Sequence, residues 1–215
     1  SLQSQGAAMP GFVLAGVLLI MVGLCFKIAA VPFHFWAPDV YEGAPTLITA
    51  FMATVVKTAA FAAFYRMFST CFGEMRETWM PALAVISAIS MLGGNILAVW
   101  QQSLKRMLAY SSVAHAGYML MAIVALNERS SGAILLYAAA YSLASMCAFA
   151  LLHSLSKHGN EQITVVRGLA KTKPLSAFFM VIALLSLAGI PPVAGFFAKY
   201  YIFTSALQSG YTWLV

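Results

Sequence analysis

The 215-residue chain is 62% hydrophobic and 8% charged, with a mean hydropathy of +0.87. Soluble domains carry about 25% charged residues, so this composition excludes an ordinary water-soluble protein and predicts a polytopic membrane protein. The formal net charge is +6, but the basic residues are scattered singly or in short connections. In a membrane protein such an excess first indicates topology, so we expect lipid rather than nucleic acid as the surrounding partner.

Apolar segments long enough to cross a bilayer recur along the whole chain. Because lipid cannot satisfy backbone polar groups, each is expected to be an α-helix. The segments comprise residues 11–31, 45–69, 79–100, 104–126, 132–155 and 174–206. The sequence therefore predicts an all-α membrane protein with about six transmembrane helices. The chain starts without Met and ends in an apolar run, so we expect it to be a fragment of a longer chain.

The first segment carries Lys27 and runs into Pro32. Proline lacks an N–H and clashes with the carbonyl four residues back, so we expect the helix to break there and to free the Ile28 carbonyl. Two interpretations of Lys27 remain. It faces the polar break, or it snorkels to the membrane interface as lysines near helix ends do.

The second segment places Lys57 near the middle of the membrane. A helix starting at Pro45 rises ~1.5 Å per residue, which puts Lys57 roughly 18 Å along it, in a hydrocarbon core ~30 Å thick. No acidic residue lies between Phe51 and Phe64. Intramembrane ionisable groups are costly and usually functional. We expect Lys57 to be functional; the alternative is a structural lysine paired within a helix bundle.

The fourth segment carries His115, which is also near mid-membrane. Histidine titrates near neutrality and can relay protons, whereas a neutral histidine can simply hydrogen-bond between helices. Both interpretations stay open. The small residues Gly93, Gly94 and Gly117 are expected to allow close helix packing.

The sixth segment is interrupted between Gly189 and Gly195 by a pair of prolines, and Lys199 follows. The prolines are expected to free the carbonyls of Leu187 and Ala188. The first and sixth segments run in opposite directions, and interrupted helices at matching places in oppositely oriented halves indicate a transporter-type site. The alternative is that the prolines merely kink the helix.

Alternate connections should fall on the same side of the membrane. One side holds residues 32–44, the start of the fourth segment and residues 156–173. Its basic residues are Lys105, Arg106, Lys157, Arg167, Lys171 and Lys173, against Arg66, Arg76 and Arg129 on the other side. The excess predicts that the first side is cytoplasmic and that residue 1 is outside.

Other polar and aromatic residues have simpler expected roles. The tryptophans near segment ends, expected to form an aromatic belt, are Trp36, Trp79, Trp100 and Trp213. The carboxylates Asp39, Glu42 and Glu161 lie in connections and are expected to be solvated or capping. The cysteines and histidines lack metal-ligand spacing, and dinucleotide-binding and P-loop motifs are absent. We therefore expect no metal or cofactor site in this chain.

Three stretches carry a resemblance to a known family. They read FKIAAVPFHFWAPDVYEGAPTLITAFMATVVKTAAF, SLKRMLAYSSVAHAGYM and SLAGIPPVAGFFAKYYIF, in that order. The chain resembles the antiporter-like membrane subunits of respiratory complex I, the NADH–quinone oxidoreductase. The pattern P-F-H-x-W-x-P-D-V-Y-x-G-A-P is specific to the N-type subunit, whereas L-K-R-x-L-A-Y-S-S is shared more widely among these subunits.

The resemblance implies about fourteen helices in two inverted five-helix repeats, of which these segments would be the seventh to twelfth. Residues 1–215 would form one transmembrane domain, with 1–70 ending the first repeat and 79–215 forming most of the second.

The resemblance also implies which lysines matter. Lys27 matches the lysine of the broken seventh helix, Lys57 that of the eighth, and Lys199 that of the broken twelfth. M-type subunits carry glutamate at this last position, so Lys199 agrees with type N. The family's glutamate on the fifth helix has no counterpart here. Lys105, beside Arg106, is expected to be a cytoplasmic topology charge.

The implied function is proton translocation coupled to quinone reduction, in the bacterial inner membrane. Burial in an apolar medium disfavours the charged amine, so Lys57 would take up and release a proton. Lys27 would modulate Lys57, Lys199 would pass the proton outward, and His115 is a possible relay. NADH, FMN, iron–sulfur clusters and quinone would serve the whole complex rather than this chain, whose partners would be other membrane subunits.

Two alternatives remain open. In the first, the chain has the same fold but belongs to a multisubunit cation/proton antiporter or a membrane-bound hydrogenase. The loop with the N-type pattern P-F-H-x-W-x-P-D-V-Y-x-G-A-P argues against this alternative. The second is a structural membrane anchor whose lysines only pair with carboxylates of other subunits.

Overall fold

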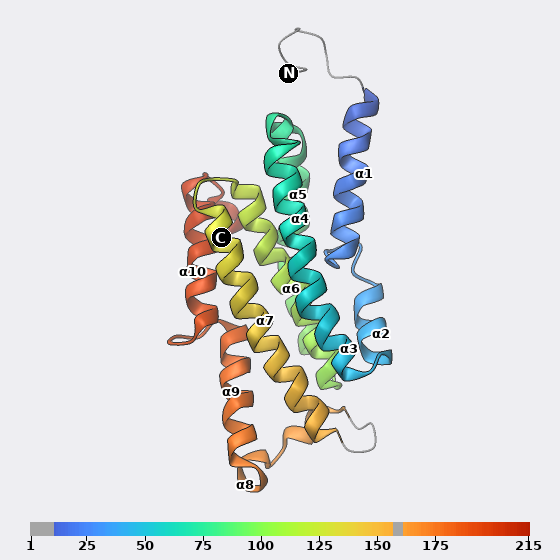
Figure 1. Ribbon diagram of the computed structural model, residues 1–215, viewed down its shortest axis with the longest axis vertical. Coiled ribbons are helices and arrows are strands. Elements are labelled where there is room, and N and C mark those ends of the chain that lie inside the picture. Colours follow the sequence, from blue (N-terminus) through green and yellow to red (C-terminus); the bar gives the residue numbers. More distant parts are fainter. Residues whose placement is uncertain (1–10, 157–160) are drawn as a thin grey trace.

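The computed structural model describes residues 11–156 and 161–215 and is helical throughout that part, where it contains no strand. A single bridge between Ser103 and Gln162 is the only sheet-like pairing among these residues. Lys157, counted above for topology, lies outside the described residues. The helices run roughly along one long axis (Figure 1), so the predicted all-α class is confirmed.

The first predicted segment is broken as expected. α1 (Gly11–Lys27) ends before Pro32, and α2 (Trp36–Gly43) begins after an irregular stretch. The amide of Val31, inside the break, donates to Ser90 Oγ at 2.9 Å. A side chain of the third segment therefore satisfies a backbone donor that the break leaves without a helical partner.

The second segment is continuous but not uniform. α3 (Thr46–Phe51) passes through a π-helical turn, η2 (Met52–Val56), into α4 (Lys57–Thr70). Together they form one span of 25 residues. π turns are rare and usually occur as single bulges at functional sites. Here the turn ends immediately before Lys57.

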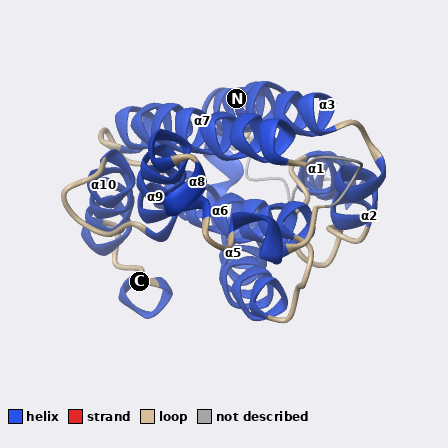
Figure 2. Cartoon of the chain, turned by 90° about the horizontal axis from the view of Figure 1, so that it is seen from below, coloured by secondary structure: helices blue, strands red, loops and turns tan. Residues whose placement is uncertain are grey.

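Three long helices follow. The short η3 (Gly73–Met75) leads into α5 (Arg76–Val99), and α6 (Leu104–Ala125) and α7 (Ser130–Leu155) come next. α6 is buried along most of its length. Seen from below (Figure 2), it lies in the middle of the molecule, with α3 and α7 on one side and α5 on the other.

The last segment is also broken. After η5 (Ile163–Val166) and α8 (Leu169–Thr172) come α9 (Pro174–Ala188), α10 (Ala194–Gln208) and η6 (Thr212–Leu214). Gly189 ends α9 with φ of 79°, a conformation that side chains disfavour. The Gly195 amide donates to Ser186 Oγ at 3.2 Å, and any Cβ on Gly195 would collide with the Ser186 carbonyl.

Four helical stretches in the described part are long and apolar enough to cross a membrane. They are Thr46–Thr70, Gly73–Val99, Leu104–Ala125 and Ser130–Leu155, with Gly11–Lys27 and Pro174–Ala188 as shorter apolar helices. With α10 counted as the second half of the last one, these correspond to the six segments predicted from sequence, two of which are broken, and their ends lie within six residues of the predicted ones.

Glycines let α5 and α6 approach closely, as predicted. A Cβ on Gly94 would lie 2.5 Å from the Ala114 amide, and one on Gly117 would lie 2.8 Å from the Ser87 carbonyl oxygen. Ser87 Oγ donates to the Gly117 carbonyl at 2.7 Å, which adds a hydrogen bond to the contact. Gly93 meets only an ordinary contact.

The aromatic belt is only partly as expected. Trp100 and Trp213 are 81% and 61% exposed at helix ends, but Trp79 is fully buried. Its ring packs edge-on against Phe68, and its Nε1 donates to the Phe72 carbonyl. Trp79 does lie near a helix end, in the first turn of α5, but packing against Phe68 and Phe72 buries it, so it does not face outward as a belt residue would.

The connections predicted to share one side do meet at one end of the bundle, the lower end in Figure 1. Lys105 is buried there and pairs with Glu161 at 3.0 Å. Arg106 pairs with Asp39 and Glu42 at 2.9 and 2.7 Å. Lys105 is therefore not a free topology charge, and these carboxylates are ion-paired rather than merely solvated.

Candidate functional site

One face of α6 carries the contacts of three candidate groups. Ser112, His115 and Tyr118 recur every third residue, a spacing that places them on the same side of a helix. Ser112 binds Lys57, His115 binds Tyr137 on α7, and Tyr118 lies against Lys199 on α10. α6 is thus the element on which the site is assembled.

Lys57 is 2% exposed at the junction of η2 and α4. Its Nζ donates to the Ser112 carbonyl at 2.8 Å and to Ser112 Oγ at 3.0 Å. No carboxylate lies within ion-pair distance of it among the described residues. Burying an ammonium without a counter-charge is expensive, and the described residues offer Lys57 only neutral acceptors.

Hydroxyl groups lie beside Lys57 on the same span. Thr58 Oγ1, on α4, lies 3.1 Å from Ser142 Oγ on α7 and joins the two helices. Thr54 Oγ1, one turn before Lys57, donates to the Ala50 carbonyl of its own helix at 2.7 Å. Hydroxyl groups can bond either protonation state of a neighbour.

His115 is 5% exposed and its Nδ1 lies 2.7 Å from the Tyr137 hydroxyl. The Tyr141 ring is also close, with a centroid separation of 4.9 Å. The contact with Tyr137 supports a histidine that hydrogen-bonds between helices. The position of His115 beside Lys199 supports a relay, so both interpretations stay open.

The Lys199 side chain binds the backbone at the break between α9 and α10. Its Nζ donates to the Ala188 carbonyl at 2.9 Å, one of the two carbonyls that the prolines were predicted to free. The same ammonium lies 4.7 Å from the centroid of the Tyr118 ring, within range of a cation–π interaction. The broken helix therefore supplies an acceptor for the lysine that follows it.

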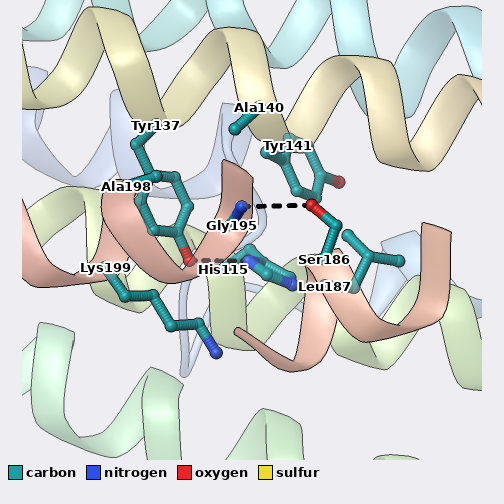
Figure 3. Close-up of a pocket in the computed structure, with 9 residues that line it drawn as sticks. All are labelled: His115, Tyr137, Ala140, Tyr141, Ser186, Leu187, Gly195, Ala198 and Lys199. Carbon is teal, nitrogen blue, oxygen red and sulfur yellow. Dashed lines mark hydrogen bonds between the residues drawn. The ribbon is translucent and has the colours of Figure 1, made fainter. Parts of the chain in front are cut away.

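His115 and Lys199 share the lining of two cavities. The smaller cavity, shown in Figure 3, has a volume of about 10 Å³ and is also lined by Tyr137, Tyr141 and Ser186. This is about the space that one water molecule needs. The larger has a volume of about 400 Å³ and extends past Asn95, Ser111 and Tyr118. Water in these cavities can connect the two residues.

Lys27 stands apart from this group. It is exposed at the end of α1, and its side chain makes no hydrogen bond or ion pair with another residue of the described ranges. The nearby Phe26 carbonyl accepts a hydrogen bond from Trp36 Nε1 at 2.9 Å. Within the described part, the structure brings Lys57, His115 and Lys199 to the face of α6 but does not bring Lys27 there.

Three members of the site, Ser112, Tyr118 and Tyr137, were missed by sequence reasoning. The three-residue spacing of Ser112, His115 and Tyr118 was visible and could have indicated a polar face. Tyr137 had no such signal, because its role depends on which helix packs against α6. Among residues 11–156 and 161–215, no group of three or more His, Cys, Asp or Glu side chains could hold a metal ion.

Comparison with known proteins gives a consistent result. The family model described as NADH:quinone oxidoreductase/Mrp antiporter, transmembrane, matches residues 3–215. A subunit N of NADH-quinone oxidoreductase from Dehalococcoides mccartyi is 46% identical over 214 residues, covering 95% of this chain and 44% of the relative. The same subunit from Cytophaga hutchinsonii is 43% identical and covers 100% of this chain and 47% of the relative.

Solved structures give the same fold. Respiratory complex I from Thermus thermophilus with bound aureothin matches with a TM-score of 0.80 and 43% identity, over 91% of this chain and 43% of that one. The Mrp complex from Dietzia sp. DQ12-45-1b matches with a TM-score of 0.85 and 27% identity, over 92% and 37%. The chain thus spans a little under half the length of the curated relatives it matches.

Proposed function

Because this chain belongs to the NADH:quinone oxidoreductase/Mrp antiporter membrane family, we propose that it is part of a proton-translocating subunit of a bacterial NADH:quinone oxidoreductase. It is a multi-pass protein of the bacterial inner membrane. Relatives at 43–46% identity are named subunit N of that enzyme, whereas the Mrp match is 27% identical. The higher identity supports the N-type assignment that the sequence motifs predicted.

The observation that carries this proposal is the environment of Lys57. A lysine held only by neutral acceptors, at 2% exposure, can change its protonation state without breaking an ion pair. A lysine fixed by a carboxylate would be expected to stay charged. Proton translocation needs a group in the middle of the membrane that can change its protonation state, as a lysine with neutral acceptors can.

The proton route that we propose follows α6. Lys57 takes up a proton from the cytoplasmic side, and Ser112 bonds the resulting ammonium. The proton then passes from Lys57 to His115, one helical turn further along α6, and His115 transfers it through cavity water to Lys199. Lys199 then releases the proton outward. Quinone reduction elsewhere in the complex changes the charges that decide when each step occurs.

Lys27 acts through a group that this chain does not contain. Its exposed position at the end of α1 leaves it available to a carboxylate from elsewhere in the longer protein. We propose that this pair alters the proton affinity of Lys57, since charges within a few ångströms shift each other's protonation.

The whole protein is proposed from its relatives. The partners are other membrane subunits of the complex, and NADH, FMN, iron–sulfur clusters and quinone are used there. We expect no redox centre in this chain. Residues 1–70 would end one inverted repeat and residues 79–215 would form most of the second.

A second candidate is a subunit of a cation/proton antiporter, favoured by the TM-score of 0.85 to the Mrp complex. The two functions use the same buried lysines. Neighbouring genes discriminate between them, because an oxidoreductase operon also encodes the subunits that bind NADH and iron–sulfur clusters.

The test replaces Lys57 in the full-length subunit of the assembled complex. Lys57→Met keeps length and apolar character but cannot titrate, so we expect normal assembly with proton pumping lowered at least tenfold, in line with loss of a positioned proton-transfer group. Pumping is measured in membrane vesicles, with complex content checked by native gel. Lys171→Met, at an exposed lysine of the short helix α8, is the control and should pump normally. Unchanged pumping in Lys57→Met would overturn the proposal.

A further inference from the structure

A second buried lysine lies at the lower end of the bundle. Lys105, in the first turn of α6, is 2% exposed. Its Nζ donates to the Ala44 carbonyl at 2.6 Å and to the Glu42 carbonyl at 3.2 Å, and it pairs with Glu161 Oε1 at 3.0 Å. Lys105 therefore holds the connection between α2 and α3 against the start of α6.

Glu161 is itself fixed by backbone contacts. Its carbonyl accepts from the Leu104 amide at 2.8 Å, and the Ile163 amide donates to the Gln102 carbonyl at 2.9 Å. Thr46 Oγ1, at the start of α3, donates to Glu161 Oε1 at 3.2 Å. The carboxylate thus joins the start of α3 to Lys105 from a segment that is anchored on α6.

The neighbouring ion pair provides a contrast. Arg106 also contacts α2, through Asp39 and Glu42, but its side chain is 30% exposed and theirs are 72% and 43% exposed. Exposed pairs of this kind contribute little. The Lys105 and Glu161 side chains are only 3% and 19% exposed. A buried pair is strongly destabilising to break, since one charge is left without its partner.

The Lys105–Glu161 pair and the Lys57–Ser112 contact both join α6 to the stretch from the α2–α3 connection to Lys57, at different depths in the bundle. Lys105 and Ser112 are seven residues apart on α6, a rise of about 10 Å and two helical turns, so they share a face. On the other element, Ala44 and Lys57 bracket α3 and the π turn η2. Lys105 binds the Ala44 end of this stretch, and Ser112 binds Lys57 at its other end.

We propose that Lys105, with Glu161, is a positioning residue that sets the register of the α2–α3 connection on α6 and thereby places the Lys57 ammonium on Ser112. The inference rests on the proposed function and adds to it a residue that the proton does not visit. Without the Lys105 contacts, α3 can shift along α6, and the π turn between the two contacts can absorb the shift. Displacements of about 1 Å at a reacting group can cost a hundredfold in rate.

The experiment is a double-mutant cycle in the full-length subunit within the assembled complex. Lys105→Met removes the pair, and Ser112→Ala removes one acceptor of the Lys57 ammonium. Protons pumped per quinone reduced are measured in vesicles, with complex content checked by native gel. Each single variant is expected to lower this ratio by at least about threefold, and the double variant by little more than the worse single one, because coupled sites are not additive.

Two further variants keep the test decisive. Arg106→Gln, which removes the exposed pair, is the control and should leave the ratio unchanged. Should Lys105→Met prevent assembly, Glu161→Gln replaces it in the cycle, since a glutamine keeps the shape and a hydrogen bond but not the charge.

Three results would overturn the positioning role. They are a normal ratio in Lys105→Met, a normal ratio in Ser112→Ala, and single effects that multiply in the double variant, as independent structural damage would. Failure of the proposed function looks different, because Lys57→Met itself would then pump normally.

Discussion

Two buried lysines on neighbouring elements differ in what binds them. Lys57 has two neutral acceptors and no carboxylate in the described part of the chain, while Lys105 has Glu161 at 3.0 Å. Burial is the same for both, at 2% exposure. The partner, rather than the burial, therefore separates the lysine suited to proton exchange from the lysine suited to holding a structure.

The sequence predicted one of these lysines and not the other. Lys57 stands alone in a long apolar run, so its depth follows from helix geometry. Lys105 sits beside Arg106 near a helix start, where a charge is usually exposed. Neighbouring residues on a helix point about 100° apart, so one of the pair faces the core and the other solvent. Only the packing of α2 and Glu161 against α6 shows which.

The two interpretations of His115 can be separated by a pair of variants. His115→Gln can still hydrogen-bond Tyr137 but cannot titrate, whereas His115→Leu can do neither. If His115 relays protons, the Gln variant should assemble normally and pump at least tenfold less, since a general acid–base group typically contributes about 100-fold or more. Normal pumping in the Gln variant, with impaired assembly in the Leu variant, would show that the histidine only joins α6 to α7.

At the scale of elements, the breaks do more than interrupt helices. The α9–α10 break exposes the Ala188 carbonyl, which accepts from Lys199. This acceptor helps to offset the desolvation of the half-buried ammonium. The α1–α2 break acts less directly: it turns the chain into α2, whose far end supplies the Glu42 and Ala44 carbonyls to Lys105.

The second break can be tested at its glycine. In Gly189→Ala, the added Cβ would lie 2.7 Å from Lys199 Cδ, and φ is already 79°. Gly168→Ala carries similar backbone strain, with φ of 71°, but meets nothing within 4 Å. We expect both variants to lose about 1–2 kcal/mol of stability, measured by thermal inactivation of the complex. Only Gly189→Ala should also lose pumping, because only it displaces Lys199. Equal pumping in both variants would contradict the role of Lys199.

The sequence predicted the elements better than their irregularities. Apolar length set the helix ends to within a few residues, and prolines marked both breaks. The π turn η2 had no signal, since Met52–Val56 contains no glycine or proline. It depends on how α3 and α4 pack against α7. The burial of Trp79 had no signal for a related reason, because it depends on how Phe68 and Phe72 pack against the start of α5.

At the scale of the whole molecule, α6 connects everything that the site needs. It contacts the Lys57 helix, α7 through Tyr137, α10 through Lys199 and the lower connections through Lys105. The number of segments was sufficient to predict that alternate connections lie at the same end of the bundle. The central place of α6 was not, because a nearly uniform apolar helix gives no periodic signal of which face is buried. The inverted-repeat arrangement stays a prediction, since it involves the rest of the longer relatives.

Proton uptake and release by Lys57 is the central claim, and Lys57→Arg tests it most directly. Arginine keeps the positive charge but cannot release a proton near neutral pH. Vectorial pumping per quinone reduced is measured in vesicles, with complex content matched to wild type. The account predicts that the Arg variant assembles but fails to pump, as Lys57→Met does. Pumping at the wild-type ratio would show that a fixed charge is sufficient, and it would contradict the account.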